Sequence, residues 1–224
     1  MKLTLVIPVL NEADRLPETL AQLAGMRARG VELIVVDGGS TDDSVAVAHA
    51  TGVRTLSAQA GRACQMNAGA AAATGDALLF LHADTTLPPH ADAIVLDALG
   101  RGSHAWGRFD VMIEGRPWVL RGVAAMMNLR SRLTGIATGD QAMFVTRTAF
   151  DAVAGFPEQP LMEDIELSRR LLDLSRPACL RHKVCTSGRR WERHGVWRTI
   201  ALMWRLRFAY WRGTPPDELA RVYR

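Results

Sequence analysis

Cysteines and long apolar runs are both scarce in this sequence of 224 residues. The three cysteines, Cys64, Cys179 and Cys185, lack the spacing of metal ligands, and an odd, sparse set is typical of reduced thiols in the cytosol. No stretch approaches the ~18 uninterrupted apolar residues of a membrane-spanning helix. The apolar start at residues 1–7 is cut short by polar residues from Asn11 onward, which predicts a first strand rather than a secretory signal. We therefore expect a cytoplasmic protein with no segment that crosses a bilayer.

Two common nucleotide-binding motifs are also missing. The first expected strand is not followed by G-x-G-x-x-G, which a dinucleotide-dependent dehydrogenase needs, and the Gly-Lys-Ser/Thr sequence of a Walker A loop does not occur. The chain has no internal repeat, no low-complexity linker and no clear domain boundary. With 48% hydrophobic residues it can bury one sizeable core, so we expect one domain over residues 1–224.

The charge is divided unevenly between the two halves of the chain. Residues 1–112 carry 8 Lys and Arg against 12 Asp and Glu, a charge of −4, whereas residues 113–224 carry 19 against 11, a charge of +8. The acidic half suits a metal ion, and the basic half suits phosphates or an anionic surface. We expect no nucleic-acid partner.

Apolar patterns predict alternating strands and helices, the signature of an α/β protein with a doubly wound, mostly parallel, Rossmann-like sheet. The expected strands cover residues 3–9, 31–36, 53–56, 76–81, 106–114 and 142–145. The expected helices include residues 61–73, 117–133 and 162–174, and a helical segment near the C-terminus.

Polar groups follow three of the expected strands at the point where each strand ends. They are Asn11-Glu12, Asp37-Gly38 and His82-Ala83-Asp84. In open α/β sheets ligands bind outside the carboxyl ends of the strands. Carboxylates and amides there accept hydrogen bonds from a base or ribose, and one carboxylate can hold a divalent ion on a diphosphate. Alternatively, Asp84 caps a helix that opens near Pro88.

These motifs resemble those of the family-2 nucleotide-sugar glycosyltransferases, which have the GT-A fold, and in particular a compact, single-domain bacterial branch. The similar segments are residues 8–12, 36–42, Gly61-Arg62 with Gln65 and Asn67, His82-Ala83-Asp84 and Met162-Glu163-Asp164. The resemblance implies an inverting, non-processive enzyme that moves a sugar, most often from a UDP-sugar, to an acceptor hydroxyl. It assigns nucleotide binding to Pro8, Asn11, Glu12, Asp37, Gly38, Arg62, Asn67 and Asp84. Residues 1–112 would form the nucleotide and metal half, and residues 113–190 the acceptor and catalytic-base half.

The chain departs from the family pattern at two places. His82 replaces the first Asp of the D-x-D metal motif, so the metal, Mg²⁺ or Mn²⁺, would be held by Asp84 with His82, or His82 would only pack in the pocket wall. Ser187 replaces Gln in a segment that resembles the Q-x-x-R-W motif of processive members. Arg189, Arg190 and Trp191 in that segment would clamp the diphosphate, unless they form a solvated basic loop.

The resemblance makes Asp164, with its neighbour Glu163, the general base that takes the proton of the acceptor hydroxyl. Asp140 is the rival base. The alternative role for Glu163 and Asp164 is purely structural, as two acids at a helix N-terminus, where the macrodipole favours them by ~0.3–1 kcal/mol.

Residues 191–224 are expected to form a basic, aromatic helical tail. Trp197, Trp204 and Trp211 recur every seven residues, each followed by Arg, so they line one helical stripe. Such a stripe suits peripheral contact with the inner membrane face and a lipid-linked acceptor. Packing on the catalytic domain, or a homodimer through residues 194–212, is the alternative. Two other classes remain open, a nucleotidyltransferase on the same sheet and a non-catalytic membrane-surface binding module.

Overall fold

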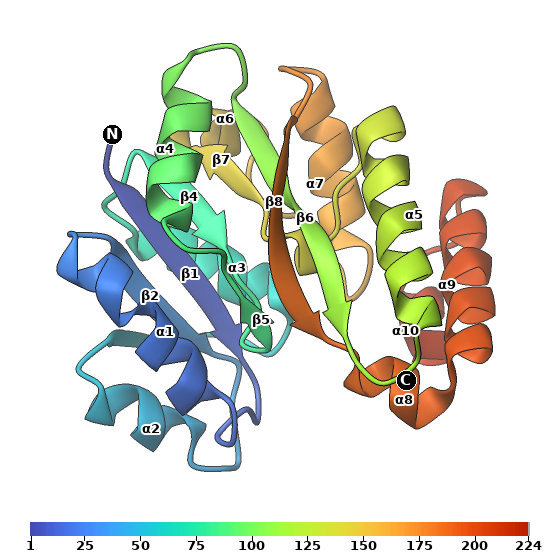
Figure 1. Cartoon of the computed structure of the whole chain (residues 1–224), viewed down its shortest axis with the longest axis horizontal. Coiled ribbons are helices and arrows are strands. Elements are labelled where there is room, and N and C mark those ends of the chain that lie inside the picture. The colour runs from blue at the N-terminus through green and yellow to red at the C-terminus, as the bar shows by residue number, and fades with distance from the viewer. Residues whose placement is uncertain (224) are drawn as a thin grey trace.

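The structure, a computed structural model, describes residues 1–223, without the side chain of Arg190. Its centre is one sheet of eight strands in the order β3-β2-β1-β4-β7-β6-β8-β5 (Figure 1). The strands are β1 Leu3–Val9, β2 Glu32–Asp37, β3 Arg54–Ser57, β4 Ala77–Phe80, β5 Thr85–Thr86, β6 Trp106–Glu114, β7 Phe144–Thr146 and β8 Ala178–Ser187.

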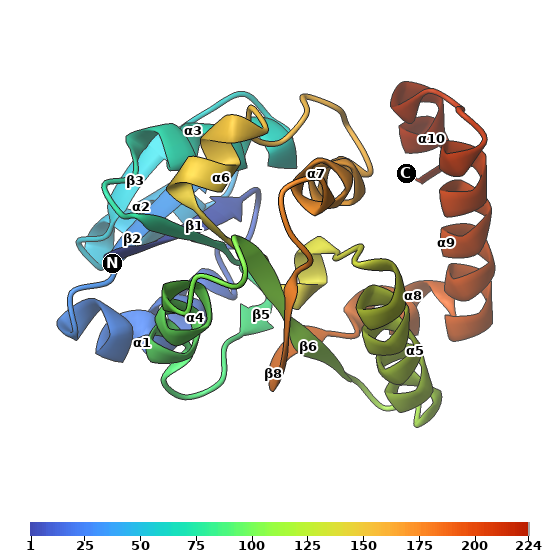
Figure 2. The same cartoon turned by 90° about the horizontal axis from the view of Figure 1, so that it is seen from above.

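The first four strands in space are parallel and are covered on both faces. β1 pairs in parallel with β2 and β4, and β2 pairs in parallel with β3. Alternate residues of β1 point to opposite sides: Leu5 and Ile7 join the core cluster that contains α1 (Leu16–Ala28) and α4 (Ala91–Gly100), whereas Val6 joins the cluster that contains α3 (Arg62–Ala72). Figure 2 shows α3 and α6 above this sheet and α1 and α4 below it. The doubly wound arrangement expected from the sequence is therefore confirmed here.

The second half of the sheet is mixed. β7 pairs antiparallel with both β4 and β6, β8 runs parallel to β6, and β5 runs antiparallel to β8. β8 is not apparent from the sequence, because exposed Arg181, His182 and Lys183 interrupt its apolar pattern. Close approach between β6 and β8 depends on Gly107, where an added Cβ would lie 2.5 Å from the Ala178 carbonyl oxygen.

Helices of the second half surround this mixed part of the sheet. They are α5 Val119–Thr134, α6 Arg147–Ala152, α7 Glu163–Leu172, α8 Arg189–His194, α9 Val196–Trp211 and α10 Pro216–Tyr223, and the short helix α2 spans Ser44–Ala50. The helices α5 and α7 lie where helices were expected over residues 117–133 and 162–174. The expected helical tail over residues 191–224 contains α9 and α10, and α8 overlaps its start. Leu206 of α9 packs with Met162 and with Leu219 of α10 in a small separate apolar cluster, which attaches the C-terminal helices near the start of α7.

The tryptophan stripe of α9 does not pack on the rest of the described chain. Trp197, Trp204 and Trp211 form a stripe as expected, but they are 65% to 78% exposed. Packing on the catalytic domain is therefore wrong for these side chains, because α9 turns its opposite side, with Leu206, toward the protein. Among residues 1–223, no helix has both the length and the apolar character that crossing a membrane requires.

Candidate active site

Three adjoining cavities lie beyond the carboxyl ends of β1 and β4, and Arg62 and His82 line all three. The first cavity, which we call the nucleotide-side cavity because residues predicted to bind nucleotide line it, is bounded by Pro8, Glu12 and Asp84. The middle cavity, of about 740 Å³, also contains Asp84 and extends to Arg189 and Trp191. The inner cavity is lined by Asp140, Glu163 and Asp164 and by apolar side chains. The fold therefore joins the segments predicted from widely separated parts of the sequence.

The polar turns that follow β1 and β2 mainly support the wall of the nucleotide-side cavity, and few of their side chains line it. The Asn11 side-chain oxygen accepts a hydrogen bond of 2.8 Å from the Thr41 N–H, and the Asp37 carboxylate accepts bonds from the N–H groups of Gly39 and Ser40. Gln65 donates to the carbonyl oxygens of Val9 and Val36, both at 2.8 Å, which ties the ends of β1 and β2 together. Gly38 packs directly on Gln65, since an added Cβ would lie 2.9 Å from that side chain. Asn11, Asp37 and Gly38 are thus beside the cavity, whereas Pro8 and Glu12 line it.

Asn67 lies outside the cavity lining and makes two hydrogen bonds to a single residue. Its amide nitrogen donates to the Phe156 carbonyl oxygen at 2.8 Å, and its oxygen accepts from the Phe156 N–H at 2.9 Å. This pair fixes the segment before α7, which carries Phe156 and Met162 into the inner cavity.

A guanidinium group lies between the two carboxylates on the nucleotide side. Arg189 approaches Glu12 at 3.6 Å and Asp84 at 3.8 Å. Asp84 does not cap the following helix, because α4 begins only at Ala91. The predicted role of Arg190 falls on a side chain outside the described residues. Within the described residues, no group of three or more His, Cys, Asp or Glu side chains is placed to hold a metal ion.

His82 is packed in the wall between the cavities. Its Nδ1 lies 3.5 Å from an Asp140 carboxylate oxygen, and a Cβ on Gly139 would lie 2.5 Å from its Cε1. Only glycine at 139 leaves room for the ring. His82 therefore links the end of β4 to the loop that carries Asp140.

The acidic pair at the start of α7 lies in the inner cavity. The Asp164 carboxylate accepts hydrogen bonds from the N–H groups of Gly139, at 2.9 Å, and Ile165, at 2.7 Å. Burial nevertheless raises the pKa of Asp164 above its ordinary value, and the charge of Asp140 adds to the increase. Burial and then the charge of Asp164 likewise raise the pKa of Glu163.

Arg62 supplies positive charge next to these carboxylates. Burial by itself would lower its pKa, but the negative charges around it, first that of Glu163, leave the pKa raised. Arg62 therefore stays charged at the meeting point of the three cavities. A strongly basic group next to carboxylates of raised pKa is an arrangement typical of a functional site.

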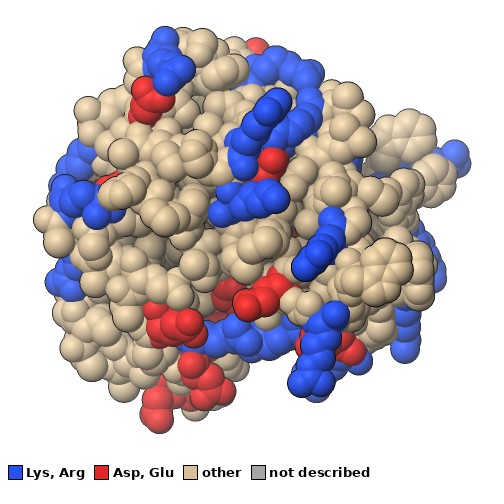
Figure 3. Space-filling model, in the orientation of Figure 1, with Lys and Arg blue, Asp and Glu red and all other residues tan. Residues whose placement is uncertain are grey.

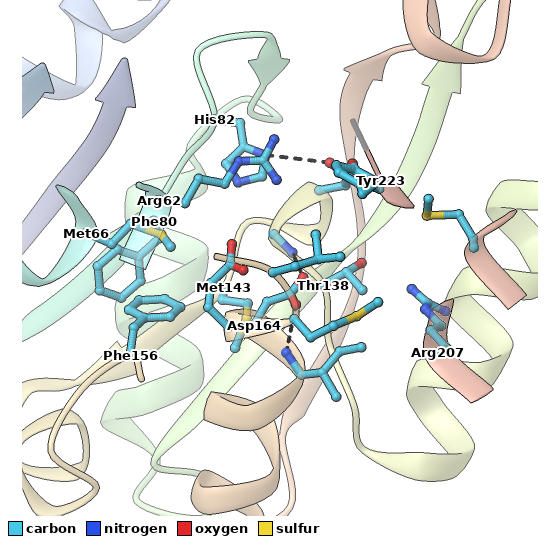
Figure 4. A pocket seen from close by; sticks show the side chains of 17 residues that line it. Arg62, Met66, Phe80, His82, Thr138, Met143, Phe156, Asp164, Arg207 and Tyr223 are labelled. Atoms are coloured by element: carbon cyan, nitrogen blue, oxygen red, sulfur yellow. Dashed lines mark hydrogen bonds and ion pairs between the residues drawn. The ribbon is translucent and has the colours of Figure 1, made fainter. Parts of the chain in front are cut away.

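Sequence reasoning missed the contribution of the C-terminal helices to the site. Met203 and Arg207 of α9 and Tyr223 of α10 line the inner cavity. Figure 4 shows Arg207 on the side of this cavity away from Phe80 and Phe156. One feature of the sequence indicates that a second side of α9 faces the protein. It is a helical row of apolar residues, Leu202, Met203 and Leu206, which lies apart from the tryptophan stripe.

The arrangement of strands and helices defines the fold class of the protein as GT-A. Residues 4–152 match the family model described as Glycosyl transferase family 2. The chain belongs to that family.

Curated relatives share about a third of the aligned residues. An undecaprenyl-phosphate 4-deoxy-4-formamido-L-arabinose transferase of Klebsiella pneumoniae is 32% identical over 152 residues, which are 62% of this chain and 46% of that protein. A PGL/p-HBAD biosynthesis glycosyltransferase of Mycobacterium bovis is 37% identical over 108 residues, 45% of this chain and 42% of that protein. The chain thus matches less than half the length of either relative.

Solved structures share the fold at low sequence identity. S. aureus TarS in complex with UDP-GlcNAc has a TM-score of 0.66 and 18% identity, over 84% of this chain and 58% of that one. Glucosyl-3-phosphoglycerate synthase from Mycobacterium tuberculosis, in complex with Mn²⁺, UDP and phosphoglyceric acid, has a TM-score of 0.62 and 21% identity, over 81% of this chain and 69% of that one.

Proposed function

We propose that this protein transfers a sugar from a nucleoside-diphosphate sugar to a hydroxyl group of an acceptor, with inversion at the anomeric carbon. The donor we propose is a UDP-sugar. The observation that carries the proposal is the continuity of the three cavities through Arg62 and His82. This continuity lets a donor on the side of Pro8, Glu12 and Asp84 present its sugar to Asp164. Family membership supports sugar transfer as the reaction.

Asp164 acts as the general base in this proposal. As the acceptor oxygen bonds to the anomeric carbon, its proton passes to a carboxylate oxygen of Asp164, and the bond from that carbon to the diphosphate breaks. The nucleoside diphosphate leaves with the electron pair. The raised pKa of Asp164 makes it a stronger base than an exposed aspartate. Asp140, which lines the same cavity, remains the rival base.

Positive side chains stabilise the charge that develops on the leaving diphosphate. Arg62 and Arg189 both line the middle cavity, and Arg189 already contacts two carboxylates there. A cation is most effective where negative charge grows during the reaction. Trp191 lines the same cavity and closes it on the side of α8.

Mg²⁺ or Mn²⁺ fits this site only together with the donor. The described residues offer no complete set of protein ligands, but a magnesium ion is commonly held by one or two carboxylates and substrate phosphates. Asp84 is the residue that would hold it, and His82 is a second candidate that is packed against Gly139. When bound, the metal would neutralise charge on the diphosphate. Support comes from the structurally similar glucosyl-3-phosphoglycerate synthase, which was crystallised with Mn²⁺ and UDP and also with Mg²⁺ and UDP.

We assign residues 1–112 to nucleotide and metal binding, residues 113–190 to the acceptor and the base, and residues 191–224 to the tail. The acceptor is lipid-linked and is used at the inner face of the cytoplasmic membrane. Support comes from the Klebsiella relative, whose name contains undecaprenyl phosphate. The exposed tryptophan stripe agrees with a peripheral position at a membrane.

The test begins with a thermal-shift screen of sugar nucleotides, each with and without Mg²⁺ or Mn²⁺. A donor at 100 times its dissociation constant adds ~2.7 kcal/mol to the free energy of unfolding, which is readily measured. The stabilising donor is then incubated with bacterial lipid extract, and the released product is analysed. Release of a nucleoside diphosphate supports sugar transfer, whereas release of pyrophosphate indicates a nucleotidyltransferase. Vesicle binding without stabilisation by any donor would indicate a non-catalytic binding module.

A further inference from the structure

Two helices at one end of the molecule expose apolar side chains that no other part of the described chain covers. On α5 these are Trp118, just before the helix, and Met126, Leu129 and Leu133, which are 58% to 84% exposed. Met126, Leu129 and Leu133 follow one another at helical spacing, so they form one outward row. The opposite side of α5 carries buried Leu120 and Ala124. The outward row is therefore not needed for the core.

The second exposed apolar row is on α9. Trp197, Trp204, Phe208 and Trp211 are 62% to 78% exposed. The two helices stand beside each other at the end of the molecule that also carries the C-terminal helices, on the right in Figure 1 and in Figure 2. A surface helix normally presents polar residues to water, and large apolar patches mark interaction sites. Together the two rows form what we call the α5–α9 surface.

The charge of the α5–α9 surface has one sign. The α9 sequence contains Arg198, Arg205 and Arg207, with Arg212 directly after it, and no Asp or Glu. The α5 sequence also lacks Asp and Glu; its Arg121 is exposed, whereas Arg132 pairs with Asp110 and Arg130 is partly buried. Figure 3 shows blue patches among the tan atoms over this end of the molecule and little red. A second copy of the chain would bring a surface of the same sign against this one. An anionic lipid bilayer offers the opposite charge together with an apolar interior.

We propose that the α5–α9 surface docks the protein on an anionic membrane, with its tryptophan and leucine side chains in the interface and its arginines at the lipid head groups. Tryptophan and arginine are suited to this depth, since each has an apolar body and a polar end. The surface includes α5, which the tryptophan pattern of the sequence did not reveal.

Docking through α9 leaves the inner cavity one helix diameter, ~10 Å, from the lipid. Met203 and Arg207, on the same helix as the exposed tryptophans, line the cavity that contains Asp164. An amphiphilic acceptor could keep its chain in the bilayer while its head group reaches Asp164 past Arg207, whose charge favours an acidic head group. This statement about the acceptor rests on the proposed function, whereas docking itself does not.

Vesicle flotation tests the docking. The full chain is mixed at low and high salt with vesicles of phosphatidylcholine alone, or of phosphatidylcholine with phosphatidylglycerol. We expect binding to the anionic vesicles that weakens with salt, and little binding to the neutral ones. Replacing Arg198 and Arg205 by Gln should lower the affinity about 25-fold, which is ~2 kcal/mol at 1.4 kcal/mol per tenfold change. The matched control replaces Arg54 and Arg101 by Gln, which removes the same amount of positive charge. These two arginines pair with Glu32 and Asp97 elsewhere on the surface.

Trp204→Ser with Trp211→Ser removes exposed apolar area without touching the core, and should reduce binding at any salt concentration. Leu129→Ser with Leu133→Ser tests the contribution of α5 in the same way. Absence of binding at low salt, or equal loss in the control, would overturn the proposal. So would a stable dimer, in analytical ultracentrifugation, that the tryptophan substitutions dissociate. Stabilisation by UDP and Mg²⁺ without vesicles reports on the proposed function separately, so the two failures are distinguishable.

Discussion

Replacing Asp164 by Asn separates the chemical role of this side chain from its structural role. Asn keeps the shape and one oxygen acceptor, but it cannot take a proton from the acceptor hydroxyl. We expect sugar transfer to fall by ~10²-fold or more, the range for loss of a positioned general base. Donor affinity should stay near that of the parent, because Asp164 lies in the inner cavity and does not line the nucleotide-side cavity.

The effect of this substitution on stability follows from the contacts of Asp164. The carboxylate accepts two backbone hydrogen bonds, from Gly139 and Ile165, and Asn can replace only one of them. Loss of a bond to a charged acceptor costs about 1.5–3 kcal/mol. Against this, Asn removes a charge that burial and Asp140 disfavour, as the raised pKa shows. We therefore expect a net change in unfolding free energy within ~2 kcal/mol at neutral pH.

The same raised pKa gives the sign of a pH effect. The folded protein holds the Asp164 proton up to a higher pH than the unfolded chain does, so this group's contribution to stability is fully present below the ordinary aspartate pKa. It is lost as pH rises through the raised folded value. Thermal unfolding should show this loss in the parent and less of it in Asp164→Asn. The transfer rate should rise over the same range as the base ionises.

Initial rates of nucleoside-diphosphate release measure the chemical effect, and thermal unfolding of the same samples measures stability. Glu163→Gln is the matched control, because it neutralises the adjacent buried carboxylate and leaves Asp164 in place. It should retain more transfer than Asp164→Asn. If Asp164→Asn transferred sugar at nearly the parent rate while Asp140→Asn did not, the reasoning would be refuted and Asp140 would be the base.

Three further substitutions test other parts of the site. Asp84→Asn should weaken metal-dependent binding of a nucleoside diphosphate in calorimetry while the melting temperature stays unchanged, and unaltered binding would remove the metal assignment. Asn67→Ala should destabilise the protein by about 1–3 kcal/mol in denaturant unfolding, because it leaves the N–H and C=O of Phe156 without their partner. Gly139→Ala should reduce transfer more than stability, because the new Cβ would displace His82, and a fully active variant would contradict that packing.

The sequence alone was sufficient for the first half of the fold and for several of the segments that line the three cavities. Parallel strands buried on both faces leave continuous apolar runs such as 77–81, and these runs end where the polar groups begin. The resemblance to family motifs assigned Asp84 to the metal and Asp164 to the base, and the structure places each of them in the lining of one of the adjoining cavities.

Other features depended on the tertiary structure. β8 has exposed basic residues at its centre, so its sequence has no clear apolar pattern. Its pairing with β6 is seen only in the structure. Asn67 was predicted to bind nucleotide, but its amide bonds to Phe156, a residue 89 positions away in the chain. No local pattern can specify such a contact.

Helix α9 shows the same division between what the sequence determines and what the tertiary structure decides. Its seven-residue repeat determined that the tryptophans share one stripe, since side-chain positions on a helix follow from spacing alone. Which side of that helix faces the protein depends on its neighbours, and Leu206 packs with Met162 and Leu219 on the other side. The burial of a side chain depends on contacts between distant segments, so only the tertiary structure decided that the tryptophans face outward while Met203 and Arg207 line the inner cavity.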